Sequence, residues 1–435
     1  MRDAKIETMP RAELEKLQLS RLKTKVKEVY DKVPFYRKAF KDKGVAPGDI
    51  KTLADITRLP FTSKLDFRDN YPFGLLAVPL EQVVRIHSSS GTTGKPIIAP
   101  YTQGDVDMWA EVMARTLASA GVTKNDIVQN AYGYGLFTGG LGFHYGAERL
   151  GAVVIPAGTG NTKRQLLMIK DLGTTVITCT PSYAIILHET AKETGFDFKE
   201  TKLKIGVCGA EPWSEQMRND IESRLGISAI NIYGLTEVVG PGVSVECEHK
   251  CGMHIWEDHF LAEVINPQTG EHMPPGQLGE LVFTTLTKEA QPVIRFRTRD
   301  LVTMNTDTCK CGRTMMRMSR VMGRSDDMLV VKGVNVFPSQ IESVLLDVEG
   351  VEPQYIIVVD RQHGFKADDL EIWVEVSEDV FSDEIGKMEA LEKKLRAELE
   401  SVLSISPRIK LVEPRTLART EGKAKRVVDR SELKK

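Results

Sequence analysis

The sequence of 435 residues has no apolar run long enough to span a membrane and no excess of charge of either sign. A membrane-spanning helix needs about 20 consecutive, mostly apolar residues, so no membrane partner is expected. The 58 Lys and Arg residues are balanced by 60 Asp and Glu residues, which gives a formal net charge of −2. A nucleic-acid-binding protein usually carries a strongly basic surface, so that class is disfavoured. The first residues are charged and contain no apolar signal core, and we therefore expect a cytoplasmic protein.

Cysteine is also scarce, with six residues in the whole chain. This number is too small for a disulfide scaffold, and disulfides are rare in a reducing compartment. Two of the six, Cys179 and Cys208, lie in apolar, strand-like runs and are predicted to be small buried residues. The other four need a separate explanation.

The four remaining cysteines form two close pairs, Cys247 with Cys251 and Cys309 with Cys311, and His254 follows the first pair. Thiolates and imidazoles favour tetrahedral Zn²⁺, which takes four ligands. Cys247, Cys309 and Cys311 are the three expected ligands, and either Cys251 or His254 supplies the fourth. A site with four protein ligands is closed to substrate, so the pattern predicts a structural zinc rather than a catalytic one. The alternative is four free thiols.

The apolar pattern predicts an α/β protein. Short apolar runs typical of strands alternate with stretches of helical spacing, which is typical of βαβ units and a mostly parallel sheet. The expected strands cover residues 83–86, 152–155, 175–179, 203–208 and 229–233. The expected helices cover residues 105–120, 183–193 and 215–225. Ligands bind at the carboxyl ends of such strands, so the loops that follow them are expected to carry the chemistry.

The length predicts at least two domains, because one hydrophobic core stops growing at about 250–300 residues. We place the N-terminal domain at residues 1–324, closed by short strands at 281–285, 293–297 and 301–304, and the C-terminal domain at residues 325–435. Residues 370–376 alternate with period two, as a half-buried strand does. One apolar stripe follows at helical spacing: Ile385, Met388, Leu391, Leu395, Leu399 and Val402. These patterns indicate a small α+β domain of roughly ferredoxin-like type.

A run rich in hydroxyl groups and glycine, at residues 88–96, directly follows the first expected strand. Its backbone N–H groups, its hydroxyls and one lysine are available to bind an anion. It is not a Walker A motif, because only two residues separate Gly91 from Gly94 and proline follows Lys95. A flexible surface loop is the alternative, but the preceding strand and the lysine favour a phosphate-binding loop.

Residues 89–96 resemble the phosphate loop of the adenylate-forming acyl-CoA ligases. Five further motifs of that family follow in the expected order, at residues 209–212, 233–237, 297–300, 323–327 and 422–423. Three other segments, at residues 59–64, 256–260 and 332–338, look specifically like phenylacetate-CoA ligases. The resemblance spans residues from about 60 to 426 and implies a large adenylate-forming domain joined by a hinge to a small mobile domain.

The resemblance implies an ATP-dependent aryl-acid CoA ligase. Such an enzyme forms an acyl adenylate and pyrophosphate, and then the CoA thioester and AMP, with ATP, Mg²⁺ and coenzyme A as cofactors. The residues implied to bind the nucleotide are Ser89, Ser90, Gly91, Thr92, Thr93, Gly94, Lys95, Gly209, Ala210, Glu211, Tyr233, Gly234, Asp300 and Arg324. Among the implied catalytic residues, Glu237 would bind Mg²⁺ and Thr236 would contact phosphate. Lys423 would bridge the carboxylate and α-phosphate oxygens as charge builds in the transition state.

The resemblance also implies a moving C-terminal domain. Its hinge would lie at Asp326, and Lys332 and Gly333 would approach the pantetheine channel when Lys423 leaves. The chain departs from the wider superfamily at one position. The ribose motif usually has glycine before the aspartate, and here Arg299 stands there.

The acyl pocket is expected around residues 132–140, where aromatic residues alternate with glycines that could admit a flat ring. The candidates are Tyr132, Tyr134 and Phe137, and a buried aromatic turn is the alternative. The resemblance favours His254 over Cys251 as the fourth zinc ligand. It also implies a homodimer.

Simpler explanations exist for single residues and for the whole chain. Judged alone, Lys423 belongs to a solvated basic tail, Glu237 caps a helix and Tyr233 is a core residue. An adenylation enzyme that loads a carrier-protein thiol shares the same motifs, as does a non-catalytic protein that binds aryl acids or nucleotides. A zinc-ribbon nucleic-acid module is the remaining alternative, and the balanced charge disfavours it.

Overall fold

The computed structural model describes residues 1–89, 96–325, 329–331, 334–363, 366–382, 385–403, 405–419 and 426–430. The chain forms two compact units. Unit 1 comprises Met1–Cys179, Ala191–Ala210 and Gly226–Arg320, and unit 2 comprises Thr180–Thr190, Glu211–Leu225 and Val321–Lys435. The functional division into residues 1–324 and 325–435 stays a prediction. Within the described ranges, no helix is long and apolar enough to cross a membrane.

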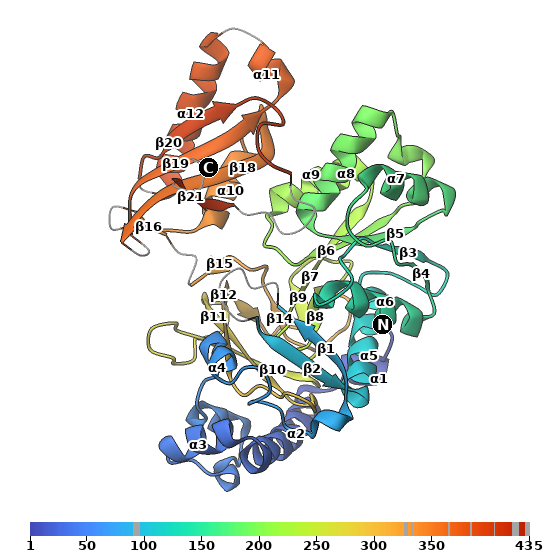
Figure 1. The fold of residues 1–435 in the computed structure, drawn as a ribbon, viewed down its shortest axis with the longest axis vertical. Coiled ribbons are helices and arrows are strands. Elements are labelled where there is room, and N and C mark those ends of the chain that lie inside the picture. Colours follow the sequence, from blue (N-terminus) through green and yellow to red (C-terminus); the bar gives the residue numbers. More distant parts are fainter. Residues whose placement is uncertain are drawn as a thin grey trace. The chain divides into compact units, whose positions relative to one another are not determined.

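The largest described sheet of unit 1 runs in the order β13-β14-β9-β8-β7-β6-β5-β3-β4 (Figure 1). The pairs β4–β3, β3–β5, β5–β6 and β6–β7 are parallel. The pairs β7–β8, β8–β9, β9–β14 and β14–β13 are antiparallel. The bounds are β3 Ile127–Asn130, β4 Val153–Ile155, β5 Val176–Cys179, β6 Ile205–Gly209, β7 Ser228–Leu235, β8 Gly240–Glu246, β9 Met253–Ile255, β13 Met304–Asn305 and β14 Arg317–Met318. The predicted α/β fold is confirmed, and Cys179 and Cys208 are buried in this sheet as expected.

Helices connect and cover these strands. Those of unit 1 are α1 Ala4–Glu7, α2 Arg11–Lys32, α3 Pro34–Asp42, α4 Lys64–Asp69, α5 Gln103–Ser119, α6 Thr138–Leu150 and α7 Thr162–Asp171, with short 3₁₀ turns at η1 Pro47–Asp49, η2 Leu53–Arg58, η3 Leu80–Gln82 and η4 Phe198–Glu200. Helix α8, Pro181–Thr194, begins in unit 2 and ends in unit 1. Helix α5 starts at a capping box in which the Thr102 hydroxyl accepts from the Asp105 N–H at 3.0 Å. Helices α5 and α6 pack against each other and against β8.

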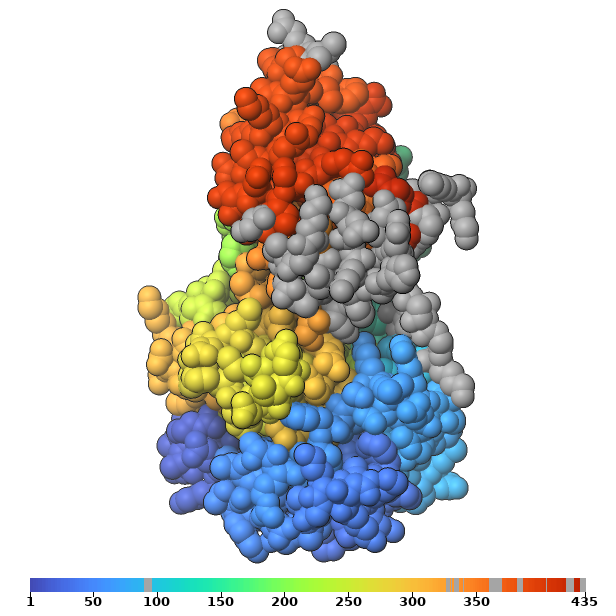
Figure 2. Space-filling model, turned by 90° about the vertical axis from the view of Figure 1, so that its left-hand side faces the viewer, coloured from blue at the N-terminus to red at the C-terminus, as the bar shows by residue number. Residues whose placement is uncertain are grey.

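Two smaller sheets complete unit 1. Strands β1 Val83–Ser88 and β2 Ile98–Thr102 pair antiparallel, as do β10 Phe260–Ile265, β11 Gly279–Thr285 and β12 Phe296–Val302 in that order. The predicted strand 293–297 begins too early, because Arg295 has a positive φ of 46° that breaks the extended backbone before Phe296. The N-terminal residues, coloured blue, adjoin the yellow residues of the β10–β11 region in Figure 2, and the Phe61 ring lies 4.0 Å from the Arg295 guanidinium.

Unit 2 is built around its own sheet, in the order β17-β16-β19-β18-β21, with β20 paired to β19. Its elements are α9 Glu215–Leu225, β15 Gly323–Arg324, β16 Leu329–Val331, β17 Val334–Val336, α10 Pro338–Leu346, β18 Val351–His363, β19 Lys366–Val376, α11 Glu378–Ser382, α12 Ile385–Leu403, β20 Arg408–Val412 and β21 Val427–Asp429. The apolar stripe of α12 is buried through Leu391, Leu395 and Leu399, as predicted. It ends on Leu403 and not on Val402, which is 49% exposed, because a four-residue step keeps the side chain on the same helix face.

Candidate functional site

The segment predicted to bind phosphate joins β1 to β2, with Ser88 opposite Ile98. Ser89 lies at its start. The Ser89 N–H donates to the Ile97 carbonyl at 2.9 Å, and its Oγ accepts from the Ile97 N–H at 3.1 Å. The rest of the predicted loop lies outside the described residues: Ser90, Gly91, Thr92, Thr93, Gly94 and Lys95.

Tyr233 and Asp300, predicted to contact the base and the ribose of a nucleotide, are brought together from two sheets. Tyr233 lies near the end of β7, and Asp300 lies in β12. The Tyr233 hydroxyl donates to Asp300 Oδ2 at 2.6 Å, and Asp300 is 8% exposed. An aromatic ring and a carboxylate, the two groups that a nucleoside site needs, therefore lie beside each other.

Asp300 is part of an irregular stretch of β12. Val282 faces Arg297 and Glu280 faces Leu301, so two residue steps on β11 oppose four on β12. We call this stretch, residues 298–300, the bulge. At its centre Arg299 has φ +69°, a conformation that costs a residue other than glycine about 1–3 kcal/mol. This strain is the physical reason why glycine suits the position before the aspartate.

Two arginines at the bulge share one buried carboxylate, that of Glu280, which is 0% exposed. Arg297 donates to it from Nε at 3.1 Å and from Nη2 at 2.5 Å. The Arg299 N–H donates to Oε1 at 3.3 Å, and its Nη1 lies 3.5 Å from Oε2. Arg299, whose contacts the motif left open, thus pairs with Glu280. Glu280 was not predicted from the sequence, because its contacts depend on the register of β11 against β12.

Glu237 and Thr236 lie buried in the turn between β7 and β8. Glu237 Oε1 lies 3.6 Å from Lys64 Nζ and makes no hydrogen bond among the described residues. Lys288, which was not predicted from the sequence, is buried and interacts electrostatically with the Glu237 carboxylate. Burial lowers the pKa of Lys288 to about 8, although Asp105 and Glu237 oppose the shift. A buried carboxylate oxygen without a hydrogen bond is suited to a cation.

The predicted adenine-side elements are placed in part. At the end of β6, a Cβ on Gly209 would lie 2.4 Å from the Ile232 carbonyl, and one on Gly234 in β7 would lie 2.1 Å from the Gly240 carbonyl, so both positions need glycine. Ala210 has φ +72°. In unit 2, Glu211 Oε1 accepts from the Ser182 N–H at 2.7 Å, at the start of α8.

Five further predicted residues lie at the expected hinge or in the expected C-terminal domain. Arg324 lies in β15 and is partly exposed. The others, Asp326, Lys332, Gly333 and the catalytic candidate Lys423, lie outside the described residues. Their roles stay predictions.

The three acyl-pocket candidates differ in their surroundings. Tyr132 is buried, and its hydroxyl donates to the Cys179 carbonyl at 2.5 Å and accepts from the Gly209 N–H at 3.0 Å. It thereby links the ends of β5 and β6. Tyr134 is half-buried, and its hydroxyl accepts from Asn130 Nδ2 at 2.8 Å. Phe137 is half-buried at the start of α6. Their contact with an acid stays a prediction.

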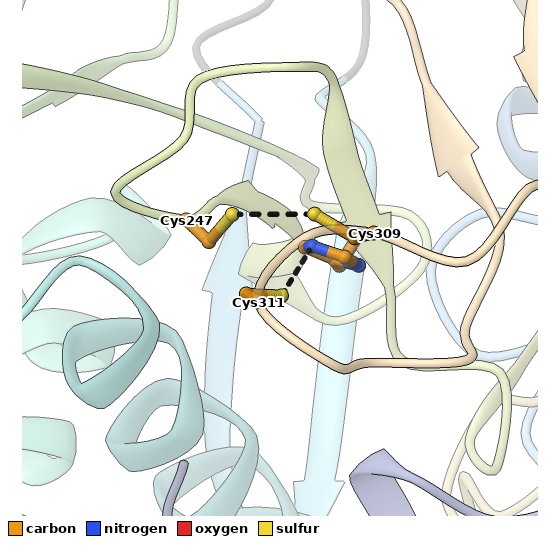
Figure 3. A group of neighbouring side chains, drawn as sticks. Cys247, Cys309 and Cys311 are labelled. Carbon is orange, nitrogen blue, oxygen red and sulfur yellow. Dashed lines mark hydrogen bonds between the residues drawn. The ribbon is translucent and has the colours of Figure 1, made fainter.

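Cys247, Cys309 and Cys311 lie close together in Figure 3, and His254 belongs to the same group. The ligand atoms of Cys247, His254, Cys309 and Cys311 all lie within 4.8 Å of one another. Cys247 Sγ lies 3.7 Å from Cys309 Sγ, and Cys311 Sγ lies 3.5 Å from His254 Nε2. Zn–S bonds of about 2.3 Å place two sulfurs of a tetrahedral site about 3.8 Å apart. The spacing of the four side chains therefore fits tetrahedral zinc.

Cys251 stands apart from this group. It is exposed, and although its Sγ lies 3.5 Å from Cys309 Sγ, it accepts a hydrogen bond from Arg317 Nη1 at 2.9 Å. His254 is fully buried, and burial, together with Arg313 and Arg317, lowers its pKa to about 3. Its imidazole is therefore neutral, as a metal ligand must be. The structure groups His254, and not Cys251, with the other three.

The comparisons with known proteins agree with this geometry. The family model for the AMP-binding enzyme matches residues 9–286, and that for the AMP-binding enzyme C-terminal domain matches residues 333–431. The chain is 48% identical to the phenylacetate-coenzyme A ligase of Thermus thermophilus, over 99% of both chains. It is 49% identical to that of Escherichia coli K12, over 98% of this chain and 96% of the other.

This chain belongs to the AMP-binding enzyme family.

Solved structures confirm the fold of this AMP-binding enzyme. A 2-hydroxyisobutyryl-CoA ligase, crystallised in the postadenylation state with R3-HIB-AMP, is 30% identical and matches with a TM-score of 0.93. The match covers 99% of this chain and 92% of that chain.

Residues 256–260 of this AMP-binding enzyme, which resemble phenylacetate-CoA ligases, tie the N-terminal helices to the core. Glu257 is fully buried; its carboxylate accepts from Arg11 Nη1 of α2 and from the Met316 N–H at 2.7 Å. Asp258 accepts from Arg115 of α5 at 3.1 and 3.0 Å. The segment therefore has a structural explanation.

His259 predicts a loss of stability in acid. Its Nε2 lies 3.0 Å from Arg115 Nη2 and 3.1 Å from Asp258 Oδ2, and its Nδ1 lies 2.7 Å from the Thr287 hydroxyl. Burial lowers the pKa of His259 to about 4, helped by Arg115 and Arg21 and opposed by Asp258. The unfolded chain has a histidine pKa of about 6.5. Above pH 6.5 the histidine is neutral in both states and does not reduce the free energy of unfolding. As pH falls to 4 the unfolded chain binds the proton first, and up to about 3 kcal/mol of the free energy of unfolding is lost.

Urea unfolding of the wild type and of His259→Gln between pH 8 and pH 4 measures this loss. The variant should show a smaller decrease in the free energy of unfolding below pH 6.5. An identical decrease in both proteins would remove His259 as its cause.

Proposed function

We propose that this enzyme is an ATP-dependent phenylacetate-CoA ligase. Its carboxylic acid substrate attacks the α-phosphate of ATP, pyrophosphate leaves, and coenzyme A then displaces AMP from the acyl adenylate. The observation that carries the proposal is near-full-length identity of 48–50% to four phenylacetate-coenzyme A ligases. The Tyr233–Asp300 pair at 2.6 Å supports a nucleoside site in the same chain.

The chain's own residues divide the work between holding the nucleotide and stabilising charge. Tyr233 presents its ring to adenine, and Asp300 accepts hydrogen bonds from the ribose hydroxyls. Ser89 and the loop that ends at Lys95 hold the β- and γ-phosphates. The positive charge of Lys423 stabilises the charge that builds on the α-phosphate.

Glu237, with Thr236 beside it, is the residue that would hold Mg²⁺. Its buried Oε1 has no hydrogen bond among the described residues, which fits a cation ligand. The ion neutralises phosphate charge when it is bound. When no ion is bound, Lys64 Nζ, 3.6 Å from Glu237 Oε1, compensates the negative charge of the carboxylate.

Product analysis tests the function. The enzyme is incubated with ATP, Mg²⁺ and one acid from a panel of phenylacetate, benzoate, other aryl acids and short aliphatic acids, with coenzyme A or with a carrier protein as acceptor. We expect pyrophosphate and AMP in equal amounts, with phenylacetyl-CoA as product. The proposal would be contradicted if no acid of the panel supported pyrophosphate release, or if thioester formed only on the carrier protein.

We further propose a structural zinc at Cys247, His254, Cys309 and Cys311. The purified protein should contain about one zinc per chain, because four converging ligands form a closed tetrahedral site. Elemental analysis should show that Cys309→Ser loses the metal. The matched variant Cys251→Ser, which removes the neighbouring thiol, should keep it. Loss of zinc from Cys251→Ser with retention by His254→Gln would reverse the assignment. A homodimer stays a prediction from the resemblance, and a cytoplasmic location stays a prediction from the N-terminal residues.

A further inference from the structure

The position of Asp300 is set by the bulge, which inserts extra residues into β12, and not by regular strand geometry. In a regular strand, successive side chains point to opposite faces of the sheet. Here two residue steps on β11 oppose four on β12, and Arg299 adopts φ +69° between them. Bulges of this kind re-aim a side chain and are common next to active sites. The direction of the Asp300 carboxylate thus depends on the contacts that hold the bulge, as well as on the Tyr233 hydroxyl that donates to Oδ2 at 2.6 Å.

The contacts that hold the bulge come from two consecutive residues of β11. Thr298 Oγ1 donates to the Leu281 carbonyl at 2.7 Å and accepts from the Asp300 N–H at 3.0 Å. The Glu280 carboxylate accepts from the Arg299 N–H at the centre of the bulge and from the Arg297 side chain at its start. Among the described residues, Thr298 therefore links Asp300 to β11 directly, and Glu280 fixes the strained residue before it.

Glu280 is an expensive residue to bury unless its charge is compensated. It is 0% exposed, and two guanidinium groups, those of Arg297 and Arg299, lie within 3.5 Å. This buried carboxylate restrains the backbone on either side of Thr298, because Arg297 and Arg299 must both stay within hydrogen-bond distance of it.

We propose that Glu280, with Thr298, is a positioning residue for ribose recognition: it holds the bulge in the conformation that presents Asp300 to the ribose hydroxyls. Glu280 touches no nucleotide and acts through the Arg299 N–H and the Arg297 side chain. The proposal rests on the proposed function, in which Asp300 binds the ribose.

The test is the preference for ATP over 2′-deoxyATP and 3′-deoxyATP, measured as the ratio of kcat/KM for pyrophosphate release with phenylacetate. A charged hydrogen bond to a hydroxyl makes this ratio about 10–100 in the wild type. Asp300→Ala should bring the ratio close to one. Glu280→Gln and the isosteric Thr298→Val should each lower it at least about fivefold, mainly through KM for ATP.

Glu271→Gln is the matched control. It makes the same substitution at an exposed carboxylate between β10 and β11, where Glu271 accepts from the Thr269 hydroxyl at 3.1 Å, so this variant should keep the wild-type ratio. A merely structural role of Glu280 would lower the yield or the stability of the variant without changing the ratio.

The outcomes distinguish a failure of the proposed function from a failure of the positioning role. A wild-type ratio in Asp300→Ala would remove Asp300 from ribose binding, and with it this part of the proposed function. A collapsed ratio in Asp300→Ala together with a wild-type ratio in Glu280→Gln would overturn the positioning role alone. If Glu280→Gln does not fold, a wild-type ratio in Thr298→Val overturns it.

Discussion

Lys423→Ala is expected to lower the rate of phenylacetyl-adenylate formation by at least about 10²–10³-fold, because a positive group at the developing charge contributes that much to catalysis. The second half-reaction should persist. The proposed motion takes Lys423 away before coenzyme A attacks, so its side chain has no part in that step. Pyrophosphate release measures the first half-reaction, and thioester formation from synthetic phenylacetyl-adenylate measures the second.

A neighbouring lysine of the same basic run provides the control. Lys425→Ala removes the same charge two residues further along and should leave both half-reactions at the wild-type rate. Equal loss of both half-reactions in Lys423→Ala would sink the assignment, and so would equal effects of the two substitutions on adenylation.

Glu7→Ala is expected to cost about 3–5 kcal/mol of unfolding free energy, because it leaves a buried guanidinium without its carboxylate. Glu7 is fully buried, and its Oε2 accepts from Arg313 Nε at 2.7 Å. The same arginine donates from Nη1 to Cys311 Sγ at 3.3 Å, so the pair joins helix α1 to the cysteine cluster. The variant should therefore also lose zinc to a chelator faster than the wild type.

Urea unfolding followed by tryptophan fluorescence, with zinc present throughout, measures the first effect. Glu15→Ala is the matched control, since Glu15 pairs with Arg11 on the exposed surface of α2 and such pairs contribute only about 0–1 kcal/mol. Similar midpoints for Glu7→Ala and Glu15→Ala would show that the buried pair does not stabilise the fold.

The parts of the fold that follow from local patterns could be predicted. Alternating apolar runs and helical stretches predicted the parallel strands β4, β5, β6 and β7, and the signal was clearest for β5 and β6, which are buried on both faces. Strand β3 at Ile127–Asn130 was not predicted. The predicted apolar stripe of α12 was right through Leu399 and wrong at Val402. The buried face continues at Leu403, four residues after Leu399. The strand at 293–297 was wrong where Arg295 takes a positive φ.

The candidate site residues could be named from the sequence where a motif carries the chemistry in its residue types, and their roles stay predictions. Tyr233 and Asp300 are 67 residues apart in sequence, and only the family resemblance linked them before the structure placed them at hydrogen-bond distance. His254 was likewise chosen by resemblance, and the structure groups it with three cysteines. The resemblance thus supplied the long-range pairings that residue spacing alone could not.

The supports of the site could not be predicted. Nothing in a strand pattern says that Glu280 will face Arg297 and Arg299, because that contact depends on the register of β11 against β12 and on the bulge. Lys288 reads as one charged residue in a polar stretch, yet it is buried over the Tyr101 ring at 4.6 Å. Buried charges of this kind are determined by tertiary packing, which local sequence does not report.

The most direct test of the central claim follows one oxygen atom. With phenylacetate labelled by ¹⁸O in both carboxylate oxygens, ATP and coenzyme A, mass spectrometry of the products reports which phosphorus the acid attacks. Attack on the α-phosphate predicts one ¹⁸O in AMP and none in pyrophosphate. Label in inorganic phosphate with ADP as the other product, or unlabelled AMP, would contradict an acyl adenylate and with it the proposed function.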